Sequence, residues 1–167
     1  MLSPSIIFVP GSYSLISEYK EILDALKETG YEVVAIYLPT IGLSSGKGRD
    51  TPPASMYDDA AAVAEAAERL IVGEGKNVMI VGHSYAGIPM SQSTKGLGKV
   101  EREARGERGG IVRLAILAGL VPPVGESAAS LLQSLPKEKA PPVAVDVSYH
   151  CPLSSHMANM CNFEDRG

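Results

Sequence analysis

The chain has 167 residues, enough for one compact domain with one hydrophobic core, and two full domains are not expected. Hydrophobic residues make up 45% and charged residues 20%, which is typical of a globular protein and excludes a disordered or collagen-like chain. The net charge of -4 is small, and glutamates interrupt the basic stretch at residues 95–113. Nucleic acid is therefore not an expected partner.

No apolar run approaches the roughly 18 to 20 residues that cross a bilayer, so no membrane insertion is expected. The first residues lack the basic and long apolar regions of a signal peptide, which predicts a cytoplasmic protein. Both cysteines, Cys151 and Cys161, come late in the chain, and we expect free thiols. With His150 and His156 they match no common zinc spacing, so neither a metal nor a cofactor is expected.

The first part of the chain alternates between strand and helix patterns. Residues 5–9 are a continuous apolar run that a Pro-Gly pair ends, which predicts a buried strand. Residues 17–29 carry apolar side chains at helical spacing, and residues 31–38 predict a second buried strand. Residues 40–54 are rich in Gly, Ser and Pro without periodicity, so we expect an exposed loop there.

The same alternation continues beyond this loop. Ser55 followed by Asp58 resembles a capping box, and the apolar positions behind it predict a helix at residues 56–73. Residues 77–81 predict a third strand, followed directly by a helix of small residues. A charged stretch then leads to a fourth predicted strand at residues 112–120.

Strands that alternate with helices in this way predict an α/β fold, a three-layer αβα sandwich with a mainly parallel sheet. The pattern ends after Val121, where prolines punctuate the chain and residues 127–135 are the helix candidate. We therefore expect a core at residues 1–121 and a lid-like or irregular tail at residues 122–167. If the sheet ends at the fourth strand, its open apolar edge predicts self-association.

The junction between the third strand and its helix carries the informative motif. A serine stands there between small residues in a tight strand-to-helix turn, the pattern of a nucleophile elbow. Its residues are Gly82, His83, Ser84, Tyr85, Ala86 and Gly87. Such a turn strains the backbone and pushes the serine hydroxyl outward, while the helix start presents free N–H groups to a developing oxyanion. Ser84 is the predicted nucleophile for acyl chemistry.

These residues, taken with several others in order, resemble the α/β-hydrolase superfamily, especially its small esterase-like fungal and bacterial members. The resemblance runs from about residue 5 to residue 121, so the predicted core is an N-terminal α/β-hydrolase core. It implies Ser84 as the nucleophile and an oxyanion hole formed by the backbone N–H groups of Tyr85 and Ser12. The other segments that carry it are Phe8-Val9-Pro10-Gly11-Ser12, the helix before Gly30, Tyr31-Glu32-Val33-Val34 and Leu38-Pro39.

Two departures from the family pattern lie inside the matched region. Ala86 replaces the usual second glycine, and Pro10-Gly11 stands where many relatives have His-Gly, but neither change removes a backbone donor. Pro89, in the helix after the elbow, is expected to cost one intrahelical hydrogen bond and favours a kink.

The resemblance also implies an acid and a histidine on loops after later strands, and the sequence does not identify them. Asp146 with His150 or His156 has the family's chain order, but neither histidine follows a strand in the family's Gly-His context. Two hypotheses remain. One is an esterase-like serine hydrolase for a small ester, amide or thioester. The other is a truncated, catalytically inactive relative, at most a small-molecule binding module.

Other candidate residues have simpler interpretations. His83 is expected to pack or to line the site wall and not to act as the base. Ser12, Tyr13 and Ser14 could face a substrate or cap the first helix, and the sequence leaves both open. The glycines of residues 42–48 lack the Gly-Lys-Ser/Thr ending of a phosphate loop, so nucleotide binding is not expected.

Overall fold

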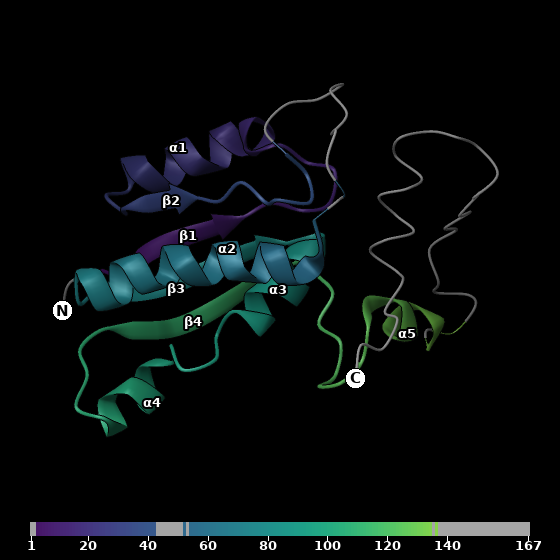
Figure 1. Ribbon diagram of the computed structural model, residues 1–167. Helices are drawn as coiled ribbons and strands as arrows, with labels where there is room; N and C mark the ends of the chain where they lie inside the picture. Colours follow the sequence, from purple (N-terminus) through teal and green to yellow (C-terminus); the bar gives the residue numbers. More distant parts are fainter. Residues whose placement is uncertain (1–2, 43–51, 53, 135, 137–167) are drawn as a thin grey trace.

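The computed structural model describes residues 3–42, 52, 54–134 and 136, which form one parallel sheet with helices on both faces (Figure 1). The sheet has four strands in the order β2-β1-β3-β4, and every pairing is parallel. Its strands are β1 (Ser5–Val9), β2 (Val33–Ala35), β3 (Asn77–His83) and β4 (Gly110–Leu117). The predicted fold class, a three-layer α/β sandwich with a parallel sheet, is confirmed.

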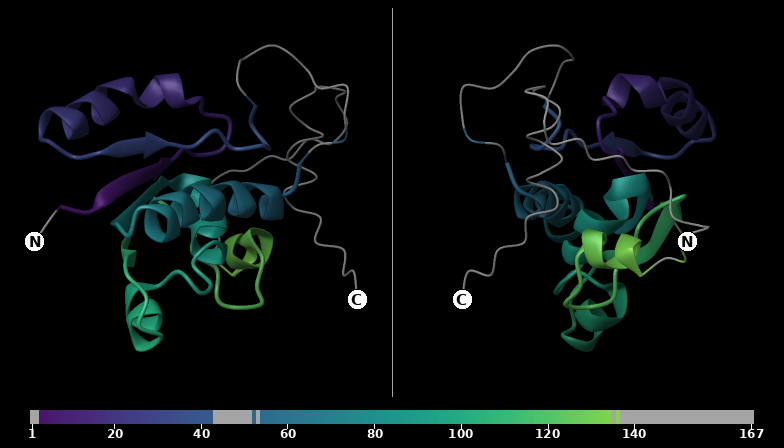
Figure 2. Two further views of the ribbon diagram at one scale, coloured as in Figure 1. Left: turned by 60° about the vertical axis from the view of Figure 1, so that its left-hand side comes forward. Right: turned by 90° about the vertical axis from the view of Figure 1, so that its right-hand side faces the viewer.

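Helices lie on both faces of the sheet (Figure 2). Helix α1 (Lys20–Glu28) lies on one face, while α2 (Met56–Glu68) and α3 (Gly87–Gln92) lie on the other. None of the helices in the described part of the chain combines the length and the apolar character needed to cross a membrane.

The apolar run of β1 explains how one strand serves both layers. Successive side chains of a strand point to opposite faces, so a strand covered on both sides must be apolar throughout. Ile6 and Phe8 pack with Leu23 on the α1 side, and Ile7 and Val9 belong to the cluster on the α2 side. All five residues of β1 are buried.

The structure revises the bounds of two early elements. The strand predicted at residues 31–38 is reduced to Val33–Ala35, because the chain pairs with β1 over that short length. The helix predicted at residues 17–29 begins as the 3-10 helix η1 (Ile16–Tyr19) before α1 continues it.

The second helix begins as predicted and ends differently. Ser55 caps α2, and the Ser55 and Asp58 side chains each bond the other's backbone N–H, so the capping box is confirmed. The predicted helix at residues 56–73 divides into α2 and the π-helix η2 (Arg69–Gly73). The third strand extends to His83, past its predicted end at residue 81.

One helix was missed. The charged stretch before β4 contains α4 (Lys99–Ala104), with a 3.1 Å ion pair between Lys99 and Glu103. Arg102 is buried, and its guanidinium donates to the carbonyls of Arg108 and Gly109. The signal in the sequence was the spacing of opposite charges four residues apart, which stabilises helices.

Two other predictions concern later helices. Pro89 is the third residue of α3, in its first turn, the part of a helix where proline is tolerated best. The helix candidate at residues 127–135 is present as α5 (Ala128–Gln133). Most of the predicted tail, residues 137–167, lies outside the described residues, so the proposed division at residue 121 stays a prediction.

Strand β4 forms one edge of the described sheet, but this edge is only partly open. Ile111 pairs with Gly98 through an isolated parallel bridge, and the Ile111 N–H donates to the Leu97 carbonyl at 2.7 Å. Val112 is skipped in the register with β3, which makes a bulge there. Bulges on edge strands discourage pairing with another chain, so the part of this edge that is suited to pairing is residues 113–117.

We propose that two copies of the chain associate along residues 113–117, since Leu117 is 44% exposed at the end of this edge. In light scattering over a concentration series, we expect the wild-type mass to rise from monomer toward dimer. Leu117→Lys should stay monomeric, because pairing would bury an ammonium group. Val124→Lys, an exposed control outside the sheet, should behave as the wild type. A wild type that is monomeric at every concentration contradicts the proposal.

Candidate active site

The strand register brings the predicted site residues to one end of the sheet. Val9 of β1 pairs with Gly82 of β3, so residues 10–12 continue beside the turn that follows β3. His83 pairs with Leu117, which places the end of β4 at the same point. The carboxyl ends of parallel strands are where α/β folds bind ligands.

Ser84 has a strained backbone at this junction. It begins the 3-10 helix η3 (Ser84–Ala86) with a φ of 54°, a left-handed conformation that non-glycine residues rarely adopt. The neighbours explain the small residues of the motif. A Cβ on Gly82 would lie 2.5 Å from the Met90 Sδ and 2.8 Å from the Ala86 Cβ. The turn therefore has no room for a side chain at residue 82 and needs a small one at residue 86.

The predicted oxyanion donors lie on the two segments that meet at Ser84. Tyr85 is in the first turn of η3, where backbone N–H groups have no intrahelical acceptor. Among the described residues, no hydrogen bond uses the Ser12 N–H, whereas the Gly11 N–H donates to the Tyr19 hydroxyl at 3.0 Å. A Cβ on Gly11 would lie 3.3 Å from the Ser84 Cβ. The loop after β1 thus approaches Ser84 closely with its backbone.

His83 packs against this loop. Its Nδ1 lies 2.9 Å from the Tyr19 hydroxyl, and the two rings meet edge-on with centroids 5.9 Å apart. The Tyr19 oxygen accepts from the Gly11 N–H, so its own proton is available to His83 Nδ1. In this arrangement His83 ties the turn after β3 to the loop after β1.

Tyr85 is anchored on the opposite side of Ser84. Its hydroxyl donates to Asp59 Oδ2 at 2.9 Å, and Asp59 on α2 is completely buried. Asp59 also accepts from the Thr40 N–H at 2.9 Å and from the Thr40 hydroxyl at 2.7 Å. Burial raises the pKa of Asp59, and burial together with the Asp59 charge raises the pKa of Tyr85, whose hydroxyl therefore stays protonated as a donor.

Asp59 is not among the site residues that the sequence predicts. The signal that could have found it is its place on the apolar face of α2, because Met56, Asp59 and Val63 fall at helical spacing. A carboxylate on a helix face that packs against a sheet needs buried hydrogen-bond donors. Its position therefore predicts polar partners inside the core.

The segment after β4 supports the elbow from a third side. The Leu120 N–H donates to the Ser84 carbonyl at 3.1 Å. A Cβ on Gly119 would lie 3.0 Å from the same carbonyl oxygen, and one on Gly87 would collide with the Leu120 carbonyl. Ala118 has a φ of 45°, so this turn is also in the left-handed region.

The sequence left open whether Ser12, Tyr13 and Ser14 cap the first helix, and the structure decides this question. Residue Leu15 is the N-cap of η1, without a side-chain cap, so the capping interpretation of the preceding residues is wrong. The Ser14 hydroxyl instead donates to the Ser12 carbonyl at 3.4 Å. Tyr13 is 41% exposed with a φ of 60°.

Several sequence candidates lie outside the described residues. They include residues 43–48 of the glycine-rich loop and the candidates for the acid, the base and the metal ligands. The latter are Asp146, His150, Cys151, His156 and Cys161. Within the described ranges, no group of three or more His, Cys, Asp or Glu side chains is placed to hold a metal ion.

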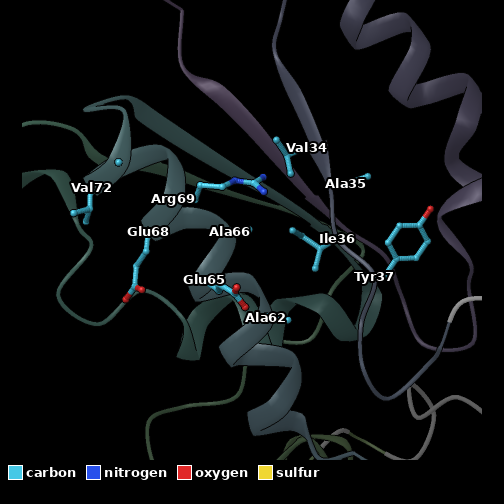
Figure 3. Close-up of a pocket in the computed structure, with 11 residues that line it drawn as sticks. Val34, Ala35, Ile36, Tyr37, Ala62, Glu65, Ala66, Glu68, Arg69 and Val72 are labelled. Atoms are coloured by element: carbon cyan, nitrogen blue, oxygen red, sulfur yellow. The ribbon is translucent and has the colours of Figure 1, made fainter.

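A surface cavity of about 740 Å³ lies away from this site, between β2 and α2 (Figure 3). Ile36 and Tyr37 border it on one side, and Glu65 and Arg69 on the other. None of the residues that line it belongs to the elbow or to the predicted oxyanion hole, so we do not assign a substrate to it.

The comparison with protein families identifies the fold of this site. Residues 6–159 match a model of the alpha/beta hydrolase family. The chain therefore belongs to the α/β-hydrolase family, and the match continues past residue 121, where the resemblance in the sequence motifs ends.

A curated relative also belongs to the α/β hydrolases. The alpha/beta hydrolase nvfD of Aspergillus novofumigatus is 35% identical over 133 residues, which cover 80% of this chain and 50% of the relative. The chain spans about half the length of the curated relatives it matches.

Solved structures show the same fold. Tomato methylketone synthase I, complexed with 2-tridecanone, matches 86% of this chain and 54% of its own chain, with a TM-score of 0.56 and 16% identity. An extracellular alpha/beta-hydrolase from a Paenibacillus species matches 81% of this chain and 48% of its own, with a TM-score of 0.51 and 16% identity. At this identity the likeness concerns the fold alone.

Gly82→Ala should destabilise the fold by about 1–3 kcal/mol, because its methyl group would overlap Met90 and Ala86 in a packed turn. The free energy of unfolding in urea measures this. Gly73→Ala is the matched control, since a Cβ there meets nothing within 4 Å. Equal stability of Gly82→Ala and the wild type would show that the turn is looser than described.

The raised pKa of Asp59 also predicts a pH dependence. The folded state holds this proton more tightly than the unfolded state, where the ordinary pKa is 3.8. The stability contributed by this group is therefore present below that value and is lost as the pH rises through the folded pKa. Relative to Asp59→Asn, the wild type should lose unfolding free energy as the pH rises above 3.8. A constant difference in urea titrations above this pH would contradict the prediction.

Proposed function

We propose that the protein is an esterase-like serine hydrolase that acts on a small ester, amide or thioester through Ser84. The observation that carries the proposal is the positive φ of Ser84 in the tight turn after β3, which the backbone at Gly11 approaches closely. Membership of the α/β-hydrolase family supports hydrolytic chemistry.

In the proposed reaction, Ser84 Oγ attacks the carbonyl carbon of the substrate and forms a new C–O bond. The carbonyl electron pair moves to oxygen, where the Tyr85 and Ser12 N–H groups stabilise the charge. The intermediate then expels the alcohol, amine or thiol and leaves an acyl-serine. Water cleaves this ester, which releases the acid and restores the Ser84 hydroxyl.

The serine proton must pass to a general base during the attack, and from that base to the departing alcohol, amine or thiol. His83 is the histidine among the described residues, and its Nδ1 contacts Tyr19. The other two histidines, His150 and His156, lie outside the described residues. This arrangement favours the second candidate function, a catalytically inactive small-molecule binding module, if the chain supplies no base. The cytoplasmic location stays a prediction.

A fluorophosphonate probe tests the proposal directly. An activated Ser84 would form a P–O bond as the P–F bond breaks and fluoride leaves, so the wild type should be labelled and Ser84→Ala should not. Ser134→Ala, at an exposed serine beyond α5, should be labelled as the wild type is.

Two outcomes contradict the proposal in different ways. Equal labelling of the wild type and Ser84→Ala would exclude Ser84 as the nucleophile. A wild type that is not labelled, although it is folded, would support the inactive binding module, because loss of the base costs about three orders of magnitude or more in rate.

A further inference from the structure

Asp59 is a carboxylate placed where an apolar side chain would pack with less cost. It is 0% exposed, and none of the ion pairs among the described residues includes it. Removing a charged group from water without a cation is unfavourable unless hydrogen bonds compensate it. A purely packing role on α2 does not account for its presence.

The compensating donors come from two other parts of the fold. Oδ1 accepts from the Thr40 N–H, and Oδ2 accepts from both the Thr40 and the Tyr85 hydroxyls. Thr40 follows β2, and Tyr85 follows Ser84. One carboxylate therefore joins α2, the loop after β2 and the elbow.

Both the backbone and the side chain of Tyr85 are held in place. Its backbone is in the first turn of η3, directly after the strained Ser84, and its phenol is hydrogen-bonded to Asp59 in the core. Tyr85 is only 6% exposed, so its side chain has little freedom to reorient. Displacing the phenol would tilt the peptide whose N–H is the proposed oxyanion donor.

We infer that Asp59 is a positioning residue of the active site. Its carboxylate fixes the Tyr85 phenol, and through it the Tyr85 amide, at the place where the oxyanion forms. This inference rests on the proposed function of Ser84. Asp59 acts through Tyr85 and does not touch the substrate.

The rate at which fluorophosphonate labels Ser84 measures the effect on chemistry. Asp59→Ala should slow labelling about tenfold or more, because small displacements of catalytic groups are costly. Tyr85→Phe keeps the backbone amide and removes only the hydroxyl, so it should slow labelling in the same direction. Asp59→Asn should recover most of the rate, since its carbonyl accepts from Thr40 and its NH₂ can donate to the two hydroxyls.

Asp58→Asn is the matched control, because Asp58 is the neighbouring carboxylate on α2 and is exposed at the helix start. It should be labelled at the wild-type rate. If folded Asp59→Ala also labels at that rate, the inference is overturned. If Asp59→Ala does not fold, the rate of Tyr85→Phe decides in the same way.

A spectroscopic measurement separates this inference from the proposed function. The chain has seven tyrosines, so ¹⁵N-tyrosine labelling gives a small set of backbone amide signals, and Tyr85→Phe assigns the signal of Tyr85. Asp59→Ala should shift that signal, and Asp58→Asn should not. If the fluorophosphonate probe does not label the wild type, the proposed function fails. The amide signal of Tyr85 then decides by itself whether Asp59 positions the turn. An unchanged signal overturns the inference.

Discussion

The strained backbone at Ser84 is the constraint on which the rest of this structure depends. A residue with a Cβ is held at a φ of 54°, which costs free energy that the surrounding packing must offset. The turn is so tight that residue 82 is glycine and residue 86 is alanine. The loop after β1 approaches the turn with its backbone at Gly11, and the segment after β4 donates the Leu120 N–H to the Ser84 carbonyl. Thr40, after β2, is linked to the turn through Asp59 and Tyr85.

Two tyrosine hydroxyls secure the residues on either side of Ser84. Tyr19 joins His83 to the Gly11 amide, and Tyr85 reaches Asp59 in the core. A tyrosine suits this task because its apolar ring packs while its hydroxyl finds a partner. The elbow is thus attached to η1 and the first loop on one face of the sheet, and to α2 on the other. The predicted nucleophile stands between the two attachments.

The sheet of this α/β-hydrolase has order β2-β1-β3-β4 in its described part, and the chain spans about half the length of the curated relatives it matches. β4 serves two roles there. Its carboxyl end braces Ser84 through Leu120, while its outer edge is covered near Ile111, bulged at Val112 and exposed beyond. The same strand therefore supports the site and leaves a surface on which another strand could pair.

The amino-acid sequence by itself determined whatever depends on neighbours along the chain. The apolar run of β1, the capping box at Ser55 and the small residues around Ser84 are local patterns with local physical causes, and they defined the fold class and the candidate nucleophile. Only the tertiary structure decided where β2 ends, because its length depends on pairing with β1. It alone also revealed the contact between Asp59 and Tyr85, which are 26 residues apart, and that between Tyr19 and His83, which are 64 apart. No periodicity or motif records such pairs, since they form only when separate helices and strands pack together.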